Sequence, residues 1–210
     1  MIKKIPYNRQ YIDKKDNLNV LRALKSKLIT TGNFVKKYEE KIKKFLNSNF
    51  AVSCSSGTSA LHLSILALGL KKNDIVIMPA INFVASYSIC KLMGAKIFLA
   101  DVDKYTGQMT PKTLLACIKK NKLKNIKLVI TMYLGGYPEN IYELYKLKRE
   151  KNFYIIEDAC HALGASYEFN KKKIMVGSCK HSDLSIFSTH PVKRITTGEG
   201  GIVTTNNKSF

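Results

Sequence analysis

Residues 127–158, KLVITMYLGGYPENIYELYKLKREKNFYIIED, carry the pattern that decides the fold. The apolar run at 127–133 predicts a buried strand, residues 140–151 predict a helix, and FYIIED at 153–158 predicts a second strand that ends in acid. Buried strands that alternate with helices are typical of a largely parallel sheet with both faces covered. Because ligands bind at the carboxyl ends of such strands, Asp158 is expected to face a ligand cleft.

The same alternation extends through the rest of the chain. Helical periodicity at about 15–28 and 34–47 predicts an N-terminal helical segment over about residues 1–48. Further strands are expected at 50–55, 75–79, 95–101, 184–188 and 200–206, and further helices at 59–68, around 83–93 and from Pro111 onward. The predicted fold class is therefore α/β.

The 210 residues suffice for one sizeable domain or for part of a larger one. No apolar run reaches bilayer-spanning length, and the N-terminal MIKKIPYNRQ lacks the apolar stretch of a secretory signal. We therefore expect a cytoplasmic protein without a membrane partner. Because NNKSF follows directly on a predicted strand, we also expect the chain to be part of a longer protein.

The net charge of +20 at pH 7 makes nucleic acid a candidate partner. The excess is almost entirely lysine, spread over helix-like segments such as VKKYEEKIKKF, which indicates solvated helix faces. We therefore expect no nucleic-acid partner, although a basic fragment with a binding role stays open as an alternative. The charge would also attract a doubly phosphorylated substrate. The chain has only four arginines, Arg9, Arg22, Arg149 and Arg194.

The five cysteines are scattered, odd in number and without a CxxC pair, so we expect no disulfide framework and no metal site. Reduced, mostly buried thiols are the simplest interpretation. They are Cys54, Cys90, Cys117, Cys160 and Cys179.

Three stretches contain residue types suited to chemistry. SSGTS at 55–59 lies between a strand and a helix, where small residues and free N–H groups favour a phosphate, although an ordinary helix cap is equally compatible. Asp158, if buried at its strand end, needs a cationic partner such as a protonated pyridine nitrogen, the alternative being a helix-capping carboxylate. His161 taken alone is more often a structural histidine.

Lys193 is the third of these features. It lies in FSTHPVK, before RITTGEGG, so that proline and glycine-rich turns enclose it. A lysine in a shielded, positively charged site can lose its proton and form a Schiff base. A surface lysine is the alternative, and only the surrounding pattern distinguishes Lys193 from the many other lysines.

The stretches IEDACHALGA, SDLSIFSTHPVK and ITTGEGGIVTTN resemble the DegT/DnrJ/StrS family of sugar aminotransferases, which use pyridoxal 5′-phosphate (PLP). TTGNFVKKYEE and SCSSGTSALHLSILALG match the family's N-terminal pattern, so the resemblance covers essentially the whole chain. The HPVK and DACHALGA forms are most similar to the pseudaminic-acid branch of this family.

The resemblance implies a fold-type I PLP aminotransferase with a three-layer α/β/α large domain and a mostly parallel mixed sheet. Family members are considerably longer, so residues 1–210 would form the N-terminal part of the PLP-binding large domain, without the small C-terminal domain. The full-length protein would be a homodimer with its sites at the dimer interface.

The resemblance also implies roles for particular residues. Lys193 would form the Schiff base with PLP and Asp158 would pair with the pyridine nitrogen. Ser188 would hold the cofactor phosphate from one side, and Gly57 with Thr58 from the other.

The resemblance implies that four further residues contact the pyridine ring or the substrate. Phe83 would stack on the pyridine ring and His161 would lie close to it. Thr31 and Gly32 would belong to the substrate-side N-terminal loop, and His190 would neighbour the sugar.

The implied reaction moves an amino group, with glutamate as donor, to the C4 keto group of a UDP-linked 4-keto-6-deoxy-N-acetylhexosamine. It would serve the biosynthesis of surface glycans or flagellin sugars. A PLP-dependent sugar dehydratase on the same fold is one alternative, although such enzymes typically carry histidine where this chain has Lys193. An inactive basic fragment is the other.

Overall fold

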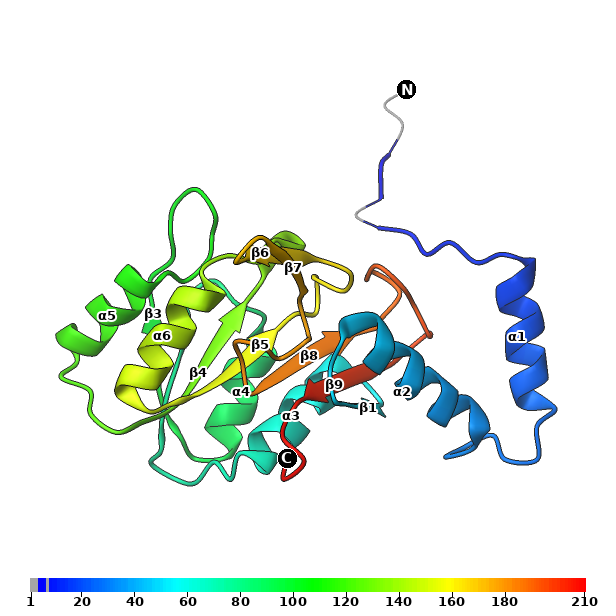
Figure 1. Ribbon diagram of the computed structural model, residues 1–210, viewed down its shortest axis with the longest axis horizontal. Coiled ribbons are helices and arrows are strands. Elements are labelled where there is room, and N and C mark those ends of the chain that lie inside the picture. The colour runs from blue at the N-terminus through cyan, green and yellow to red at the C-terminus, as the bar shows by residue number, and fades with distance from the viewer. Residues whose placement is uncertain (1–3, 7) are drawn as a thin grey trace.

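The computed structural model describes residues 4–6 and 8–210; residues 1–3 and 7 of the expected N-terminal segment lie outside the described residues. Seven strands form one sheet in the order β1-β9-β8-β5-β4-β2-β3 (Figure 1). Neighbours from β8 through β3 pair in parallel, whereas β9 is antiparallel to both β1 and β8. The prediction of a mostly parallel mixed sheet is confirmed. The strands are β1 Phe50–Cys54, β2 Ile75–Pro79, β3 Lys96–Ala100, β4 Ile126–Met132, β5 Tyr154–Asp158, β8 Leu184–Ser188 and β9 Gly201–Thr205.

Helices cover both faces of this sheet, which confirms the three-layer α/β/α arrangement. On one face, α3 (Gly57–Ala67) and α4 (Val84–Leu92) pack a core around Leu61 and Ile89. On the other face, the core contains side chains from α2 (Asn33–Leu46), α5 (Pro111–Lys120) and α6 (Ile141–Lys151).

The sequence of β4 shows why the predicted strands are continuously apolar. Leu128 and Ile130 are buried in the core under α3 and α4, whereas Val129 is buried in the opposite core. Successive side chains of a strand point to opposite faces, so a strand covered on both sides needs apolar residues at every position.

Strand register brings four strand ends to one edge of the sheet. Asp158, the last residue of β5, pairs with Met132 of β4 and Ile186 of β8. Gly201 of β9 pairs with Ser188 on one side and Cys54 on the other. Since β9 is antiparallel to both neighbours, β1 and β8 end at the edge where β4 and β5 also end. The segments that follow these four strands therefore converge.

Three parts of the fold differ from the sequence prediction. The first helix, α1 (Lys14–Leu24), ends before residue 28 because the chain turns at Ser26, whose hydroxyl donates to the carbonyls of Ala23 and Leu28. A hairpin of β6 (Ser166–Phe169) and β7 (Lys172–Met175) and the 3-10 turn η1 (Leu134–Gly136) were not predicted.

Helix α1 stands apart from the sheet in Figure 1 and has no buried residue. Its apolar side chains Leu18, Val20, Leu21 and Leu24 are each more than half exposed. Among the described residues, no helix has the length and apolar character required to cross a membrane.

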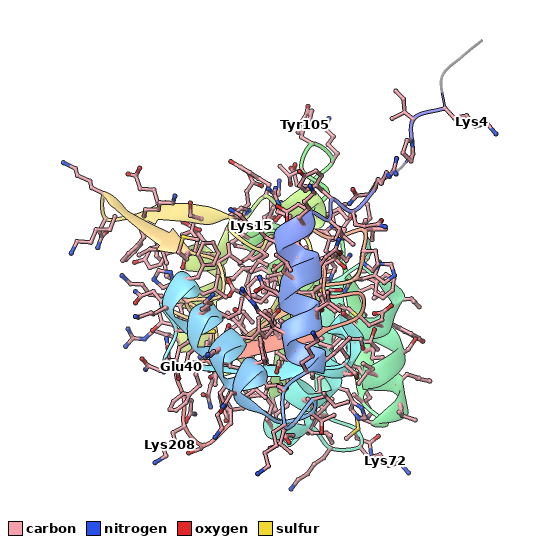
Figure 2. The ribbon with its side chains drawn as sticks, turned by 90° about the vertical axis from the view of Figure 1, so that its right-hand side faces the viewer. Lys4, Lys15, Glu40, Lys72, Tyr105 and Lys208 are labelled. Atoms are coloured by element: carbon pink, nitrogen blue, oxygen red, sulfur yellow. The ribbon has the colours of Figure 1, made fainter. Side chains whose placement is uncertain are left out.

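The lysines lie on many sides of the molecule. In Figure 2, Lys4, Lys15, Lys72 and Lys208 point outward from separate parts of the chain. This distribution agrees with solvated faces as the interpretation of the large positive charge.

Candidate active site

A cavity of about 450 Å³ lies where the four strand ends converge. It brings together every residue that the sequence associates with the cofactor, and His190 as well. These residues are Gly57, Thr58, Phe83, Asp158, His161, Ser188, His190 and Lys193. They come from four separate segments, and the register of the sheet is what places the segments side by side.

Asp158 is buried in the wall of this cavity, with 4% of its surface exposed. The Cys160 N–H donates to its Oδ1 at 3.2 Å, and no described lysine, arginine or histidine forms an ion pair with it. Burial raises the pKa of this carboxyl, an effect that Cys160, His161 and Lys193 partly oppose. A cation placed against it would relieve the cost of the buried charge.

The imidazole of His161 and the amine of Lys193 line the same cavity. Burial lowers the pKa of His161, Lys193 lowers it further, and Asp158 opposes both effects. His161 is therefore held neutral at neutral pH, as a hydrogen-bonding ring beside the carboxylate.

The N-terminus of α3 forms the opposite wall. Ser56 caps the helix by accepting from the Ser59 N–H at 3.0 Å, while the N–H groups of Gly57 and Thr58 have no protein acceptor among the described residues. A β-carbon on Gly57 would lie 2.9 Å from Ser188 Cβ, so only glycine allows this close approach. Two free N–H groups, the helix dipole and the Ser188 hydroxyl fit a phosphate.

Phe83 precedes α4 and, as a residue, is 59% exposed although it lines the cavity. An exposed aromatic face at the entrance to a cavity is suited to stacking on a planar ring. A buried acceptor for a cation, a phosphate cradle, a lysine and an aromatic face together fit PLP.

The loop after β8 fixes the position of Lys193. The Lys193 N–H donates to the His190 carbonyl at 2.8 Å and closes a tight turn around Pro191. The Thr189 and Thr197 hydroxyls hydrogen-bond at 2.6 Å across the base of the loop. A β-carbon on Gly201 would overlap the Ser56 carbonyl oxygen, so this glycine lets β9 pack against the start of α3.

Thr31 and Gly32 line neither cavity found among the described residues. Gly32 is the N-cap of α2, where a β-carbon would lie 2.5 Å from the Leu28 carbonyl oxygen, and Thr31 has a positive φ of 51°. The structure gives both residues a role in the turn before α2, and their contact with substrate stays a prediction.

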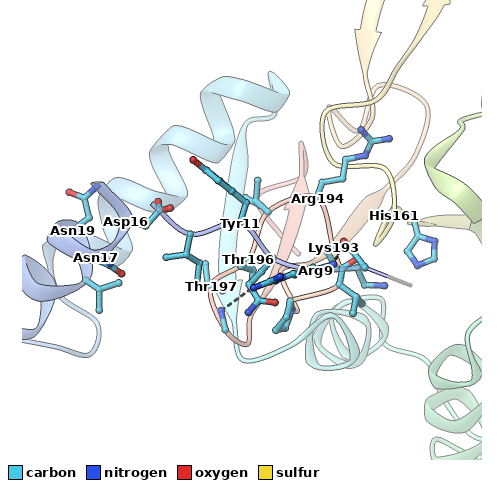
Figure 3. A pocket seen from close by; sticks show the side chains of 18 of the residues that line it. Arg9, Tyr11, Asp16, Asn17, Asn19, His161, Lys193, Arg194, Thr196 and Thr197 are labelled. Atoms are coloured by element: carbon cyan, nitrogen blue, oxygen red, sulfur yellow. Dashed lines mark hydrogen bonds between the residues drawn. The ribbon is translucent and has the colours of Figure 1, made fainter. Parts of the chain in front are cut away.

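A second, larger cavity of about 1300 Å³, which was not predicted from the sequence, shares His161, Val192 and Lys193 with the first (Figure 3). Residues 8–12, the start of α1 and the loop 191–198 line it, including Arg9 and Arg194. Cys160 was also missed as a neighbour of Asp158. The chain has only four arginines, and two of them line this larger cavity. Their scarcity was the one sequence feature that could have drawn attention to it.

A sheet of this topology with such a cavity defines a PLP-enzyme large domain of the aminotransferase class. The chain belongs to the DegT/DnrJ/EryC1/StrS aminotransferase family, whose family model matches residues 10–210.

Two curated relatives are informative. A UDP-4-amino-4,6-dideoxy-N-acetyl-beta-L-altrosamine transaminase of Campylobacter jejuni is 39% identical over 206 residues, covering 98% of this chain and 52% of the relative. A GDP-perosamine synthase of Escherichia coli O157:H7 is 34% identical over 210 residues, covering 100% of this chain and 55% of the relative.

Three solved structures have the same fold. Streptococcus pneumoniae Spr1654 in its PLP form has a TM-score of 0.87 at 28% identity, covering 99% of this chain and 55% of that one. Helicobacter pylori PseC, an aminotransferase of pseudaminic-acid biosynthesis, has 0.86 at 28%, covering 98% and 53%. The E. coli GDP-4-keto-6-deoxy-D-mannose-3-dehydratase with hydrated PLP has 0.86 at 29%, covering 98% and 52%. The chain spans about half the length of the curated relatives it matches.

Proposed function

We propose that this chain is the cofactor-binding portion of a PLP-dependent nucleotide-sugar aminotransferase. One observation carries the proposal: a single cavity contains a lysine, a buried carboxylate and a helix N-terminus, and within the described residues the carboxylate has no ion-pair partner and two of the helix N–H groups have no acceptor. These are the three groups needed to hold the aldehyde side, the ring nitrogen and the phosphate of PLP.

When bound, PLP supplies an electron sink that works only while its ring nitrogen is protonated. Asp158 Oδ would accept a hydrogen bond from the protonated ring nitrogen, because the buried carboxylate is most stable beside a positive charge. Lys193 Nζ would hold the cofactor and, as general acid and base, would move a proton to and from the amino-acid Cα.

The remaining residues of the cavity position the cofactor. Gly57 and Thr58 would donate their N–H groups to the cofactor phosphate, and Ser188 would hold it from the other side. Phe83 would stack on the cofactor ring, and His161, held neutral, would lie close to the ring without forming an ion pair with Asp158. His190 lies toward the sugar.

The substrate we propose is a UDP-linked 4-keto-6-deoxy-N-acetylhexosamine, aminated at C4 with glutamate as donor. The name of the Campylobacter relative and the pathway of the Helicobacter structure support this choice, as does the HPVK form of the lysine loop. The pathway would be that of pseudaminic acid in a surface glycan or flagellin. The Escherichia synthase makes a GDP-linked sugar the first alternative to test.

We further propose that the full-length protein is a homodimer, supported by the exposed apolar side chains of α1, which need a covering surface. Light scattering of the full-length protein tests this, and a monomer at micromolar concentration would contradict it. The cytoplasmic location expected from the sequence stays a prediction.

The test of function is an assay of the full-length protein with PLP, glutamate and either UDP- or GDP-linked 4-keto sugars. We expect formation of a 4-amino sugar and 2-oxoglutarate with wild type, and loss of both in Lys193→Ala. Mass spectrometry of the sugar distinguishes the reactions. Loss of water without gain of an amine would identify a dehydratase, and turnover by Lys193→Ala at the wild-type rate would refute the lysine assignment.

A further inference from the structure

The loop that contains Lys193 is closed at its base by a buried residue, Thr189. Thr189 follows directly on β8, is 1% exposed and lines neither of the two cavities found among the described residues. It therefore has no direct contact with the space proposed for the cofactor. Its polar contacts are with the other end of the loop, at Thr197 and Gly200.

Two backbone hydrogen bonds at Thr189 join the ends of this loop. The Thr189 N–H donates to the Gly200 carbonyl at 2.9 Å, and the Thr197 N–H donates to the Thr189 carbonyl at 3.0 Å. Because the ends are joined, fewer conformations are open to the residues between them. Within the loop, the Lys193 N–H donates to the His190 carbonyl at 2.8 Å, so Lys193 lies in a turn inside a closed segment.

The hydroxyls of Thr189 and Thr197 add a third link, and its donor can be assigned. The two oxygens are 2.6 Å apart, and the Thr197 hydroxyl donates to the Glu199 carbonyl at 2.7 Å. A hydroxyl has a single proton, so the proton between the two threonines comes from Thr189. The donors therefore run in one direction, from Thr189 through Thr197 to the backbone at Glu199.

Gly200 is what allows the two hydroxyls to come this close. A β-carbon on Gly200 would overlap the Thr189 hydroxyl and would lie 2.5 Å from Thr197 Oγ1. The same closed base holds the residue before Gly200, since Glu199 Oε1 lies 3.6 Å from His190 Nε2 and both residues line the cofactor cavity. The base of the loop is therefore tightly packed and joined to the wall of the cavity.

We propose that Thr189 is a positioning residue for Lys193: its hydroxyl and backbone hold the base of the loop together and so fix where the Lys193 amine lies. This inference rests on the proposed function, because it takes Lys193 as the residue that holds PLP. Binding at one defined atom is favoured by a loop that is ordered beforehand, because the entropy of ordering is then not lost on binding.

The first test measures the loop without any cofactor, by hydrogen–deuterium exchange and mass spectrometry of the full-length protein. Thr189→Ala removes the hydroxyl without placing a carbon against Thr197. We expect the amides of residues 190–197 to exchange about tenfold faster, the size of one buried hydrogen bond lost. Thr189→Ser keeps the donor and should retain the wild-type exchange.

The matched control is Thr205→Ala, at the opposite end of β9 from the loop. The Thr205 hydroxyl is also largely buried and donates to the Asp183 carbonyl at 2.7 Å, so its loss costs a comparable hydrogen bond. Exchange of residues 190–197 should stay at the wild-type rate in this variant. Thr197→Ala removes the acceptor of the Thr189 hydroxyl and should reproduce the effect of Thr189→Ala.

The second test asks whether Thr189 acts through Lys193, by equilibrium dialysis of the full-length protein with PLP. Thr189→Ala should weaken PLP binding by about tenfold in the wild-type background and by roughly twofold at most in Lys193→Ala, which lacks the amine to be positioned. Unchanged loop exchange in Thr189→Ala would overturn the inference. An equal loss of PLP affinity in both backgrounds would overturn it too, because the effect would then not pass through Lys193.

Failure of the proposed function gives a different result. If the wild-type protein does not bind PLP, the proposed function fails. If it binds PLP and Thr189→Ala behaves like wild type in both tests, only the role of Thr189 fails.

Discussion

At the residue scale, Asp158 is buried in the wall of the smaller cavity and forms no ion pair within the part of the chain that the structure describes. Burial raises the pKa of its carboxyl. A charge in that position is costly until a cation is bound, so function and stability conflict there.

Asp158→Asn should therefore raise the free energy of unfolding of the cofactor-free protein by about 0.5–2 kcal/mol, as relief of such conflicts commonly does. The same change should lower the rate of amine transfer by roughly 10²–10³-fold, because the ring nitrogen loses its electrostatic partner. Urea denaturation and the amination assay measure the two effects. Glu150→Gln, which removes an exposed carboxylate on α6, is the control and should change neither. A less stable but fully active Asp158→Asn would contradict this account.

The neighbouring Glu157 has a different environment. Tyr133 Oη donates to its Oε1 at 2.6 Å, Ser182 Oγ donates to its Oε2 at 2.8 Å, and Ser185 Oγ donates to Oε2 as well. Burial nevertheless raises the pKa of Glu157 above its ordinary value of 4.5, and the hydroxyl donors only partly offset it.

A carboxyl whose pKa is higher in the folded protein binds its proton more tightly there. Its stabilising contribution is full below pH 4.5 and is lost as the pH rises through the folded-state pKa. Glu157→Gln should remove this loss and flatten the decline of Tm from pH 4.5 upward. Thermal denaturation over pH 4–8 measures it, with Glu150→Gln expected to retain the wild-type slope. An unchanged slope in Glu157→Gln would show that Glu157 is not the responsible group.

At the element scale, the hairpin of β6 and β7 turns through Asn170 and Lys171, whose φ values are 50° and 60°. A two-residue turn with both φ values positive favours Asn-Gly, and lysine is strained there. Lys171→Gly should stabilise the protein by about 1 kcal/mol, the cost of a left-handed conformation for a residue with a side chain. Chemical denaturation measures it. Lys173→Gly, inside β7, should instead destabilise, and a destabilising Lys171→Gly would contradict the turn assignment.

The hairpin of β6 and β7 could not be predicted from the sequence. Its strands are short, partly exposed and rich in charge, with no apolar run, and Asn170-Lys171 lacks the glycine that marks such turns. The strands of the main sheet were predictable because burial on both faces requires unbroken apolar residues. Strands that are buried on both faces therefore show a clear apolar pattern in the sequence, whereas the exposed strands of the hairpin do not.

The same contrast applies to the site. The place of Asp158 could be predicted because it ends a recognisable strand and strand ends converge. Ser188 and Lys193 were singled out by the family resemblance of the motif that contains them, and their roles stay predictions. The place of Arg9 could not be predicted, because its proximity to the lysine loop depends on an irregular segment held by Asn8 and Val192. No local sequence pattern predicts such a contact between two segments that are far apart in the chain.

At the scale of the whole molecule, the mixed sheet is what assembles the cavity. Because β9 runs antiparallel between β1 and β8, the strand ends that precede Ser56 and Thr189 meet at the edge that contains Asp158. The lysines labelled in Figure 2 point outward from separate parts of the chain, whereas Arg9 and Arg194 line the same larger cavity.

The central claim is that Lys193 holds the cofactor. The most direct measurement is borohydride reduction of the PLP-loaded full-length protein, followed by proteolysis and mass spectrometry. The account predicts a single pyridoxyl label, on Lys193, and no label at that site in Lys193→Arg. A label on a different lysine, with Lys193 unmodified, would contradict it.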